Sequence, residues 1–213
     1  VFVINPMNNS IIDKIQVGFN PWGIVYDPYS GYVYVADFGS NTISVINPAN
    51  NTIIATIPVN SGPWGIVYNP SNGYLYVAYY YSNIISVIDP YNNTVIANIT
   101  VGLSPPTPFN TASWLPNPIS WPMGIAYDSS NGYLYVTYYW HVNNLLESNL
   151  TNKIHVVNPS NNTMIANIPV GIAPAGIAYD PSNGYIYVAI FFYNYISVID
   201  PRNNTVIANI TVG

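Results

Sequence analysis

The stretch DPYNNTVIANITVG occupies Asp89–Gly102, and DPRNNTVIANITVG occupies Asp200–Gly213. The two copies differ only at Tyr91 and Arg202, and they start 111 residues apart. Self-similarity at a fixed distance is the main sequence sign of a repeat architecture. The two copies therefore predict that the chain is built from duplicated structural units.

The turn Asn-Asn-Thr/Ser inside these copies recurs along the whole chain and sets the repeat length. Its first residue is Asn8, Asn50, Asn92, Asn161 or Asn203, so the intervals are 42, 42, 69 and 42 residues. The third interval is one period plus 27 residues, which indicates insertions. We therefore divide a single domain, 1–213, into a half unit, 1–18, and four whole units, 19–60, 61–102, 103–171 and 172–213.

Each whole unit has the pattern of four short β-strands. In 61–102 the runs PWGIVYNP, GYLYVAYY, IISVIDP and NNTVIANITVG are rich in Val, Ile and Tyr, and turn residues separate them. This composition favours strands over helices. Four antiparallel strands in about 40–45 residues make one blade of a β-propeller. The predicted fold is all-β, a propeller of 42-residue four-stranded blades, four complete and one half.

The fourth strand of each unit should lie at the outer edge of its blade. One position in this strand is polar in every unit, at Lys14, Thr56, Asn98, Asn167 and Asn209. A polar column in an otherwise apolar strand is expected where one side of the strand meets water.

Three further runs carry a family resemblance. GYVYVADFGSNTISVINP, GYLYVAYYYSNIISVIDP and GYIYVAIFFYNYISVIDP resemble the YVTN-type β-propeller repeats of archaeal surface-layer and other cell-surface proteins. The resemblance covers nearly the whole chain outside the insertions, although the name motif is degenerate. It implies a cell-surface location and a ring of about seven blades. Because 1–18 holds only two strands, we expect a part of that larger ring; the alternatives are a five-position ring with one half blade, or a partner chain that completes it.

The insertions of the unit 103–171 fall within 103–120 and within 140–152. Strand order places both at the blade end opposite the Asn-Asn-Thr turns, where loops on a rigid scaffold often carry function. The alternative is that they only cover apolar surface. The same end should carry the candidate aromatic contact residues for a glycan or protein partner, unless these residues serve packing between blades. They are Trp22, Trp64, Trp114, Trp121, Trp140 and His141.

Eight Asn-x-Ser/Thr triplets, or sequons, are candidate N-glycosylation sites in a secreted chain. They lie at Asn8, Asn50, Asn92, Asn98, Asn149, Asn161, Asn203 and Asn209. Asn is also simply favourable in turns, so duplication alone could copy it. Charged residues make up only 5% of the chain. An uncharged, glycosylated surface changes little with pH, so we hypothesise an extracellular glycoprotein from an archaeal thermoacidophile.

Other functions are disfavoured by composition. The three basic residues cannot neutralise a nucleic-acid backbone, and no apolar run reaches the ~18 residues of a membrane-spanning helix. A metal site built from Asp37, His141 and Glu147 would match no known ligand spacing. His155 has the pattern of a substitution at a position where other units carry Ser. We therefore predict no catalytic residue, metal or cofactor.

We expect a non-enzymatic, glycosylated cell-surface module for adhesion, surface-layer or filament-associated interaction. Its partners would be other cell-surface or filament proteins or glycans, with N-linked glycans attached covalently to the chain itself. The alternative is an extracellular enzyme or a ligand- or cofactor-binding propeller, with its site at the channel mouth and in blades outside this chain. Propellers host many activities, so the fold alone does not decide between the two.

Overall fold

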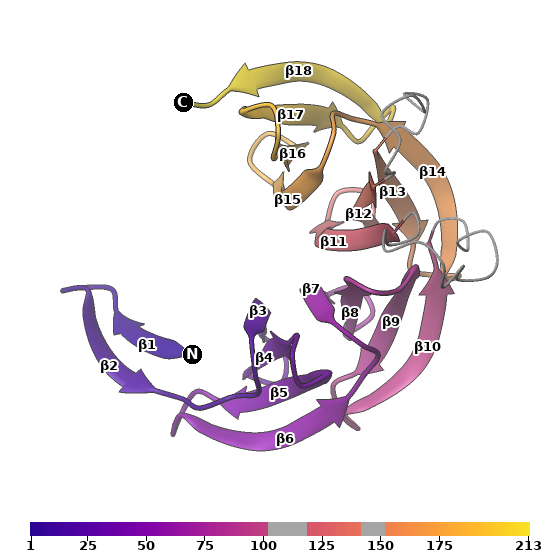
Figure 1. The fold of residues 1–213 in the computed structure, drawn as a ribbon. Coiled ribbons are helices and arrows are strands. Elements are labelled where there is room, and N and C mark those ends of the chain that lie inside the picture. The colour runs from indigo at the N-terminus through magenta and orange to yellow at the C-terminus, as the bar shows by residue number, and fades with distance from the viewer. Residues whose placement is uncertain (102–118, 142–151) are drawn as a thin grey trace, which may run out of the picture. The chain divides into compact units, whose positions relative to one another are not determined.

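The protein is described by a computed structural model that covers residues 1–101, 119–141 and 152–213, with the backbone alone at 119–121 and 139–141. This part of the chain folds into antiparallel β-strands in one two-stranded and four four-stranded sheets (Figure 1). In every four-stranded sheet the strands lie side by side in chain order. The fold is therefore that of β-propeller blades, as the repeat predicted.

The strand bounds follow the predicted units. The two-stranded sheet is β1 (Phe2–Asn5) and β2 (Ser10–Lys14). The first full blade is β3 (Pro21–Asp27), β4 (Tyr32–Asp37), β5 (Thr42–Asn47) and β6 (Thr52–Pro58). The second is β7 (Pro63–Asn69), β8 (Tyr74–Tyr79), β9 (Ile84–Asp89) and β10 (Thr94–Thr100). The third is β11 (Ile119–Asp128), β12 (Tyr133–His141), β13 (Lys153–Asn158) and β14 (Thr163–Pro169), and the fourth is β15 (Pro174–Asp180), β16 (Tyr185–Ile190), β17 (Tyr195–Asp200) and β18 (Thr205–Thr211).

Aspartate or asparagine side chains shape the turns between strands. The Asp27 carboxylate accepts the Tyr29 backbone N–H at 2.8 Å, and Asp128 accepts that of Ser130 at the same distance. Both are Asx turns, in which the side chain closes the bend two residues later. This explains why a turn with Asp or Asn at its start recurs between the strands.

The chain divides into two compact units, 1–77 with 86–97 and 78–85 with 98–213. In the first unit β1–β2 packs on the first blade, where Ile15, Val17, Val35 and Ile46 form a buried cluster. In the second unit the third and fourth blades pack face to face. Their shared core consists of Tyr135, Ile154, Val156, Ile168, Ile186, Val188, Ile190 and Ile199.

Glycine lets the innermost strands of adjacent blades approach closely. A Cβ at Gly124 in β11 would lie 2.5 Å from the Ala175 carbonyl oxygen in β15. A Cβ at Gly23 in β3 would likewise meet the Trp64 carbonyl oxygen in β7. The glycine of the recurrent Pro-x-Gly-Ile run is therefore a packing residue at these two blade contacts.

The fourth strands lie at the sheet edges, as the polar column predicted. Order β3-β4-β5-β6 places β6 outermost, and β10, β14 and β18 hold the same place in their sheets. The column residues are all exposed: Lys14, Thr56, Asn98, Asn167 and Asn209. The edge strand is thus solvated on the side that carries this column.

The third blade corrects one predicted boundary. Ile119 pairs with His141, and Ser120 pairs with Trp140, so these residues extend β11 and β12 instead of belonging to loops. Residues rich in aromatic and branched side chains readily continue an antiparallel pair, which accounts for the longer strands. The remaining residues of both insertions lie outside the described part of the chain.

Candidate functional site

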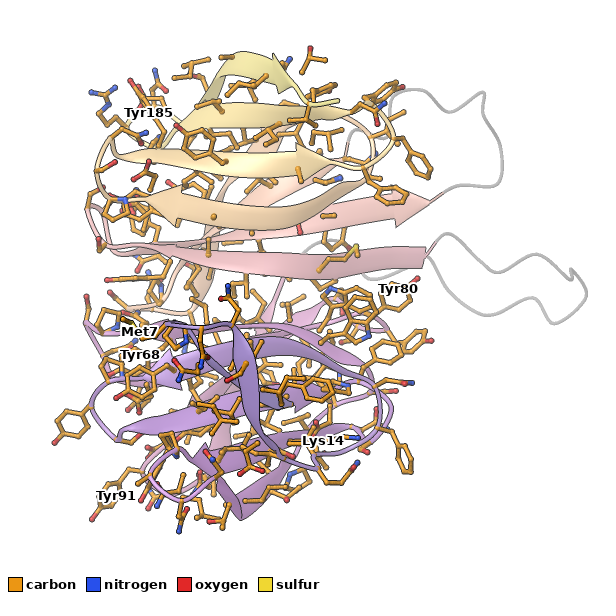
Figure 2. The ribbon with its side chains drawn as sticks, turned by 90° about the vertical axis from the view of Figure 1, so that its left-hand side faces the viewer. Met7, Lys14, Tyr68, Tyr80, Tyr91 and Tyr185 are labelled. Atoms are coloured by element: carbon orange, nitrogen blue, oxygen red, sulfur yellow. The ribbon has the colours of Figure 1, made fainter. Side chains whose placement is uncertain are left out.

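The two ends of each blade carry different chemistry. We call the end with the Asn-Asn-Thr/Ser turns, 6–9, 48–51, 90–93, 159–162 and 201–204, the sequon end. The opposite end, where chain connections follow second and fourth strands, we call the aromatic end. In the first unit Figure 2 shows Met7, Tyr68 and Tyr91 at the sequon end and Lys14 toward the other end.

At the sequon end the two asparagines of each turn have different roles. The first asparagine is exposed in all five turns: Asn8, Asn50, Asn92, Asn161 and Asn203. The second has a positive φ of 55–57° in every turn, at Asn9, Asn51, Asn93, Asn162 and Asn204. Asn tolerates this left-handed backbone better than other non-glycine residues. The first asparagine faces solvent, and the second makes the bend.

The second asparagine can also reach the preceding sheet. Asn204 Oδ1 accepts a 3.2 Å hydrogen bond from the Tyr135 hydroxyl of the third blade. Asn51 Nδ2 donates to Asp13 Oδ2 in β2 at 2.9 Å. Burial raises the pKa of Tyr135 to about 12, so its hydroxyl stays protonated as a donor. At these two turns the second asparagine is a latch between neighbouring sheets.

Two more sequon asparagines, Asn98 and Asn209, lie in fourth strands and are exposed. The Ser197 hydroxyl donates to Asn209 Oδ1 at 2.8 Å from the neighbouring strand. Asn149 lies outside the described residues. Seven of the eight predicted sequons are therefore described, and each places its asparagine at the surface.

At the aromatic end of the first unit, Trp22 and Trp64 stack on one another. Their ring centroids are 3.9 Å apart with planes 19° from parallel, and Phe38 meets Trp64 edge-on at 5.7 Å. Trp22 is 57% exposed, whereas Trp64 is partly buried. The pair therefore combines packing between adjacent blades with an exposed indole, and the contact role of Trp22 stays a prediction.

Other aromatic residues lie at this end that were not among the predicted contact residues. Phe191, Phe192 and Tyr193 follow β16 in succession and are 71%, 60% and 53% exposed. Tyr80 and Tyr81 follow β8 at the equivalent turn, and their rings meet edge-on at 5.0 Å. The signal was present in the runs AYYYSN and AIFFYNY, which place aromatic residues directly after the second strand.

The remaining aromatic candidates lie on the third blade. Trp121 pairs with Tyr139, and Trp140 pairs with Ser120, so both tryptophans lie in the extended strand pair β11–β12. His141 ends β12 opposite Ile119. The strand pair therefore brings these three backbone positions together at the aromatic end of one blade. Trp114 lies outside the described residues.

Asp37 and His155 are both buried within their blades. Asp37 is buried, and its Oδ2 accepts hydrogen bonds from the hydroxyls of Ser44 at 2.6 Å and Thr42 at 3.2 Å. His155 lies in β13, in the register position that Ser44 and Ser197 hold in their blades. Glu147 lies outside the described residues. Among the residues that the structure describes, no three His, Cys, Asp or Glu side chains are grouped as a metal site would require.

His155 is nevertheless electrostatically unusual. The residue is 4% exposed, its Nδ1 lies 2.8 Å from the Met164 sulfur, and the Tyr138 ring centroid lies 4.4 Å from the centroid of the imidazole. Burial lowers the pKa of His155 to about 4, and the nearby charge of Lys153 acts in the same direction. The imidazole is therefore neutral at ordinary pH.

No helix in the described ranges is both long and apolar enough to cross a membrane. No protein-family model matches the chain, and no curated protein matches it significantly. Solved structures do share its fold. Hydrazine synthase from Kuenenia stuttgartiensis matches with a TM-score of 0.71 and 17% identity over 94% of this chain and 52% of its own.

Two Bacteroides structures give similar matches. A protein of unknown function from Bacteroides caccae has a TM-score of 0.67 and 13% identity over 99% of this chain and 68% of its own. A protein from Bacteroides uniformis, described as a candidate 6-phosphogluconolactonase, has a TM-score of 0.67 and 17% identity over 99% of this chain and 64% of its own. At such low identity these likenesses show the fold alone. The chain spans about half to two thirds of the length of these proteins.

Proposed function

We propose that this chain is a non-enzymatic, N-glycosylated cell-surface module, in which glycans decorate the sequon end of the blades and aromatic side chains at the other end contact a partner. The partner is another cell-surface or filament protein, or its glycan. The observation that carries the proposal is the chemical difference between the two blade ends, with exposed sequon asparagines at one and exposed aromatic rings at the other.

The aromatic end supports a contact role because exposed rings are concentrated there. Three consecutive exposed aromatic residues, Phe191 to Tyr193, are costly to leave in water. Aromatic side chains supply a large contact area with little loss of side-chain freedom, so they are enriched at binding surfaces. With 5% charged residues in the whole chain, binding at this end would depend on shape and apolar area more than on charge.

The sequon end supports glycosylation because its acceptor asparagines are accessible on rigid turns. An extracellular protein with so few charges needs another solvated surface, and attached sugars would supply it. A surface of this kind changes little between acidic and neutral pH, which supports an origin in acid surroundings. Glycopeptide mass spectrometry of the protein from its native source tests this half of the proposal, and unmodified asparagines throughout would contradict it.

Binding at the aromatic end is tested with matched aromatic substitutions. Phe191→Ser and Phe192→Ser together should abolish capture of surface proteins or binding to a glycan array. Tyr29→Ser and Tyr91→Ser are the control, because these side chains are about 90% exposed at the sequon end. Equal binding by the two variants, or loss in both, would contradict an aromatic-end contact surface.

A further inference from the structure

The two near-identical stretches differ in how their sequon asparagine is bonded. In the first copy the Asn92 Nδ2 donates a 2.8 Å hydrogen bond to Asp89 Oδ2. The neighbouring Tyr91 is 88% exposed, and its side chain does not compete with Asn92 for this carboxylate oxygen. The carboxamide nitrogen of Asn92 is therefore held against the protein although the residue is exposed.

In the second copy Arg202 takes the place of Tyr91 and binds the equivalent carboxylate. Its Nε donates to Asp200 Oδ1 at 2.8 Å, and its Nη2 donates to Asp200 Oδ2 at 2.7 Å. Asn203 instead accepts a 2.7 Å hydrogen bond from the Thr205 hydroxyl through Oδ1. Its Nδ2 has no hydrogen-bond partner within the described part of the chain and is free to react.

In two other turns the sequon Nδ2 is also without a carboxylate partner, but for a different reason. At their first position they carry Asn47 and Asn158, which are neutral amides in place of a carboxylate. The Thr52 hydroxyl donates to Asn50 Oδ1 at 2.8 Å, and the Thr163 hydroxyl donates to Asn161 Oδ1 at 2.7 Å. The threonine-to-asparagine bond is thus present in three of the four Asn-Asn-Thr turns. It is not found at Asn92, where a carboxylate is available to the amide nitrogen.

The chemistry of N-linked transfer makes this difference matter. The asparagine Nδ2 attacks the anomeric carbon of a lipid-linked sugar phosphate or pyrophosphate, forming a C–N bond. The C–O bond to the phosphate breaks, its electron pair leaves on the phosphate oxygen, and a transferase base takes one Nδ2 proton. An Nδ2 that donates to a carboxylate must first lose that bond, whereas a hydroxyl bonded to Oδ1 leaves Nδ2 open.

We propose that the residue before the sequon selects which turns are modified. Arg202 binds the Asp200 carboxylate and so leaves Asn203 Nδ2 without a bond to it. Tyr91 supplies no such cation, so the Asp89 carboxylate binds Asn92 Nδ2. Asn50, Asn161 and Asn203 are the preferred acceptors among these turns, and Asn92 is the disfavoured one. The proposal rests on the glycosylation in the proposed function and adds to it an order of site use.

The test exchanges the one differing residue. Full-length chain with Arg202→Tyr or Tyr91→Arg is secreted from a host with N-glycosylation, and occupancy of each sequon is measured by glycopeptide mass spectrometry. Wild-type occupancy should be higher at Asn203 than at Asn92. Arg202→Tyr should lower occupancy at Asn203 on the order of threefold, and Tyr91→Arg should raise it at Asn92 by a similar factor.

Asp89→Asn gives the matched control, because it recreates the neutral turns of Asn50 and Asn161 without adding a cation. It should raise occupancy at Asn92 as Tyr91→Arg does. Both substitutions install residues that this chain already carries at the equivalent position, so folding should be retained. Equal occupancy at Asn92 and Asn203, or occupancies that do not follow the exchange, would overturn the proposal while leaving glycosylation intact.

If no site carries a sugar, the glycosylation in the proposed function fails, and the proposal is judged on the unmodified chain. Side-chain amide hydrogen exchange, followed by nuclear magnetic resonance, should then be slower at Asn92 Nδ2 than at Asn203 Nδ2. The order should reverse in the double variant Tyr91→Arg with Arg202→Tyr. Equal exchange at the two asparagines would overturn the selection by Arg202.

Discussion

The Thr137 hydroxyl donates a 2.9 Å hydrogen bond to the Ala175 carbonyl oxygen and so joins β12 of the third blade to β15 of the fourth. The Thr137 hydroxyl oxygen in turn accepts a hydrogen bond from the Gly124 backbone N–H at 2.7 Å. Thr137 is fully buried, and the repeat position that it occupies is Ala36, Ala78 or Ala189 in the other blades. One hydroxyl therefore satisfies two backbone groups where the inner strands meet.

Thr137→Ala should lower the free energy of unfolding by about 1–3 kcal/mol, because two partly buried backbone groups lose their partner. Urea denaturation of the unmodified chain, followed by tyrosine and tryptophan fluorescence, measures the change. Thr56→Ala is the control, since Thr56 is exposed on an edge strand and should change stability by less than about 0.5 kcal/mol. A similar effect of both substitutions would contradict a specific role for the Thr137 hydroxyl.

Replacing glycine by alanine should distinguish an innermost strand that packs against a neighbouring blade from one that does not. Gly124→Ala should destabilise the chain by about 2 kcal/mol or more, because its Cβ would overlap the Ala175 carbonyl oxygen. Gly176→Ala is the matched control, since a Cβ there would meet nothing within 4 Å. Thermal unfolding by circular dichroism compares the two variants. A loss of stability at Gly176 as large as that at Gly124 would contradict the packing explanation.

The latch asparagine and the sequon asparagine should respond differently to substitution. Asn204→Ala removes the acceptor of the Tyr135 hydroxyl and places alanine at a φ of 56°, so stability should fall by about 1–3 kcal/mol. Asn203→Ala, one residue earlier, should cost less because Asn203 is exposed and bonds only within its own turn. Denaturant midpoints of the unmodified variants test the order, and a reversed order would contradict the division of roles.

His155 should give the stability a pH dependence in mild acid. The pKa of its ring is about 4 in the folded chain against 6.5 for an ordinary histidine, so between these values the unfolded chain binds the proton more readily. Stability is highest above pH 6.5, falls as pH decreases to about 4, and loses about 3 kcal/mol in that window. Urea denaturation at pH 7, 5.5 and 4 should show this slope.

His155→Ser should remove most of this slope, because Ser occupies the same repeat position in the other three blades as Ser44, Ser86 and Ser197. The flat pH profile that the low charge predicts would then be restored. If the variant keeps the wild-type slope between pH 7 and pH 4, another titrating group is responsible.

The sequence predicted the strands because the repeat aligned five copies of the Asn-Asn-Thr/Ser turn, and every copy constrained the others. The exposed first asparagines and the edge position of Asn98 and Asn209 followed from the same alignment. Repetition reveals what the units share, so it gives no information about the positions where they differ. Thr137 and His155 replace the Ala and Ser of the other units, and Arg202 stands at a position that varies between units. The bonding partners of these three side chains become known only from the three-dimensional structure.

The aromatic end was predicted less completely for a related reason. Trp22 and Trp64 stand at the same repeat position and were easily found, but their stacking depends on how closely two inner strands approach. Phe191, Phe192 and Tyr193 were part of a run read only as a strand and its turn. The pattern of alternating Tyr and aliphatic residues did not show where β16 ends, and therefore did not show that these rings are exposed.

The polar column on the fourth strands bears on aggregation. An outermost strand offers unpaired backbone N–H and C=O groups to any other strand of suitable register, and chains rich in Val, Ile and Tyr can assemble into fibrils through such contacts. Asn98 in β10 and Asn209 in β18 lie on these rims, exposed to water. If either residue carries a branched sugar, as proposed, that sugar would be a steric barrier to the growth of a sheet between molecules.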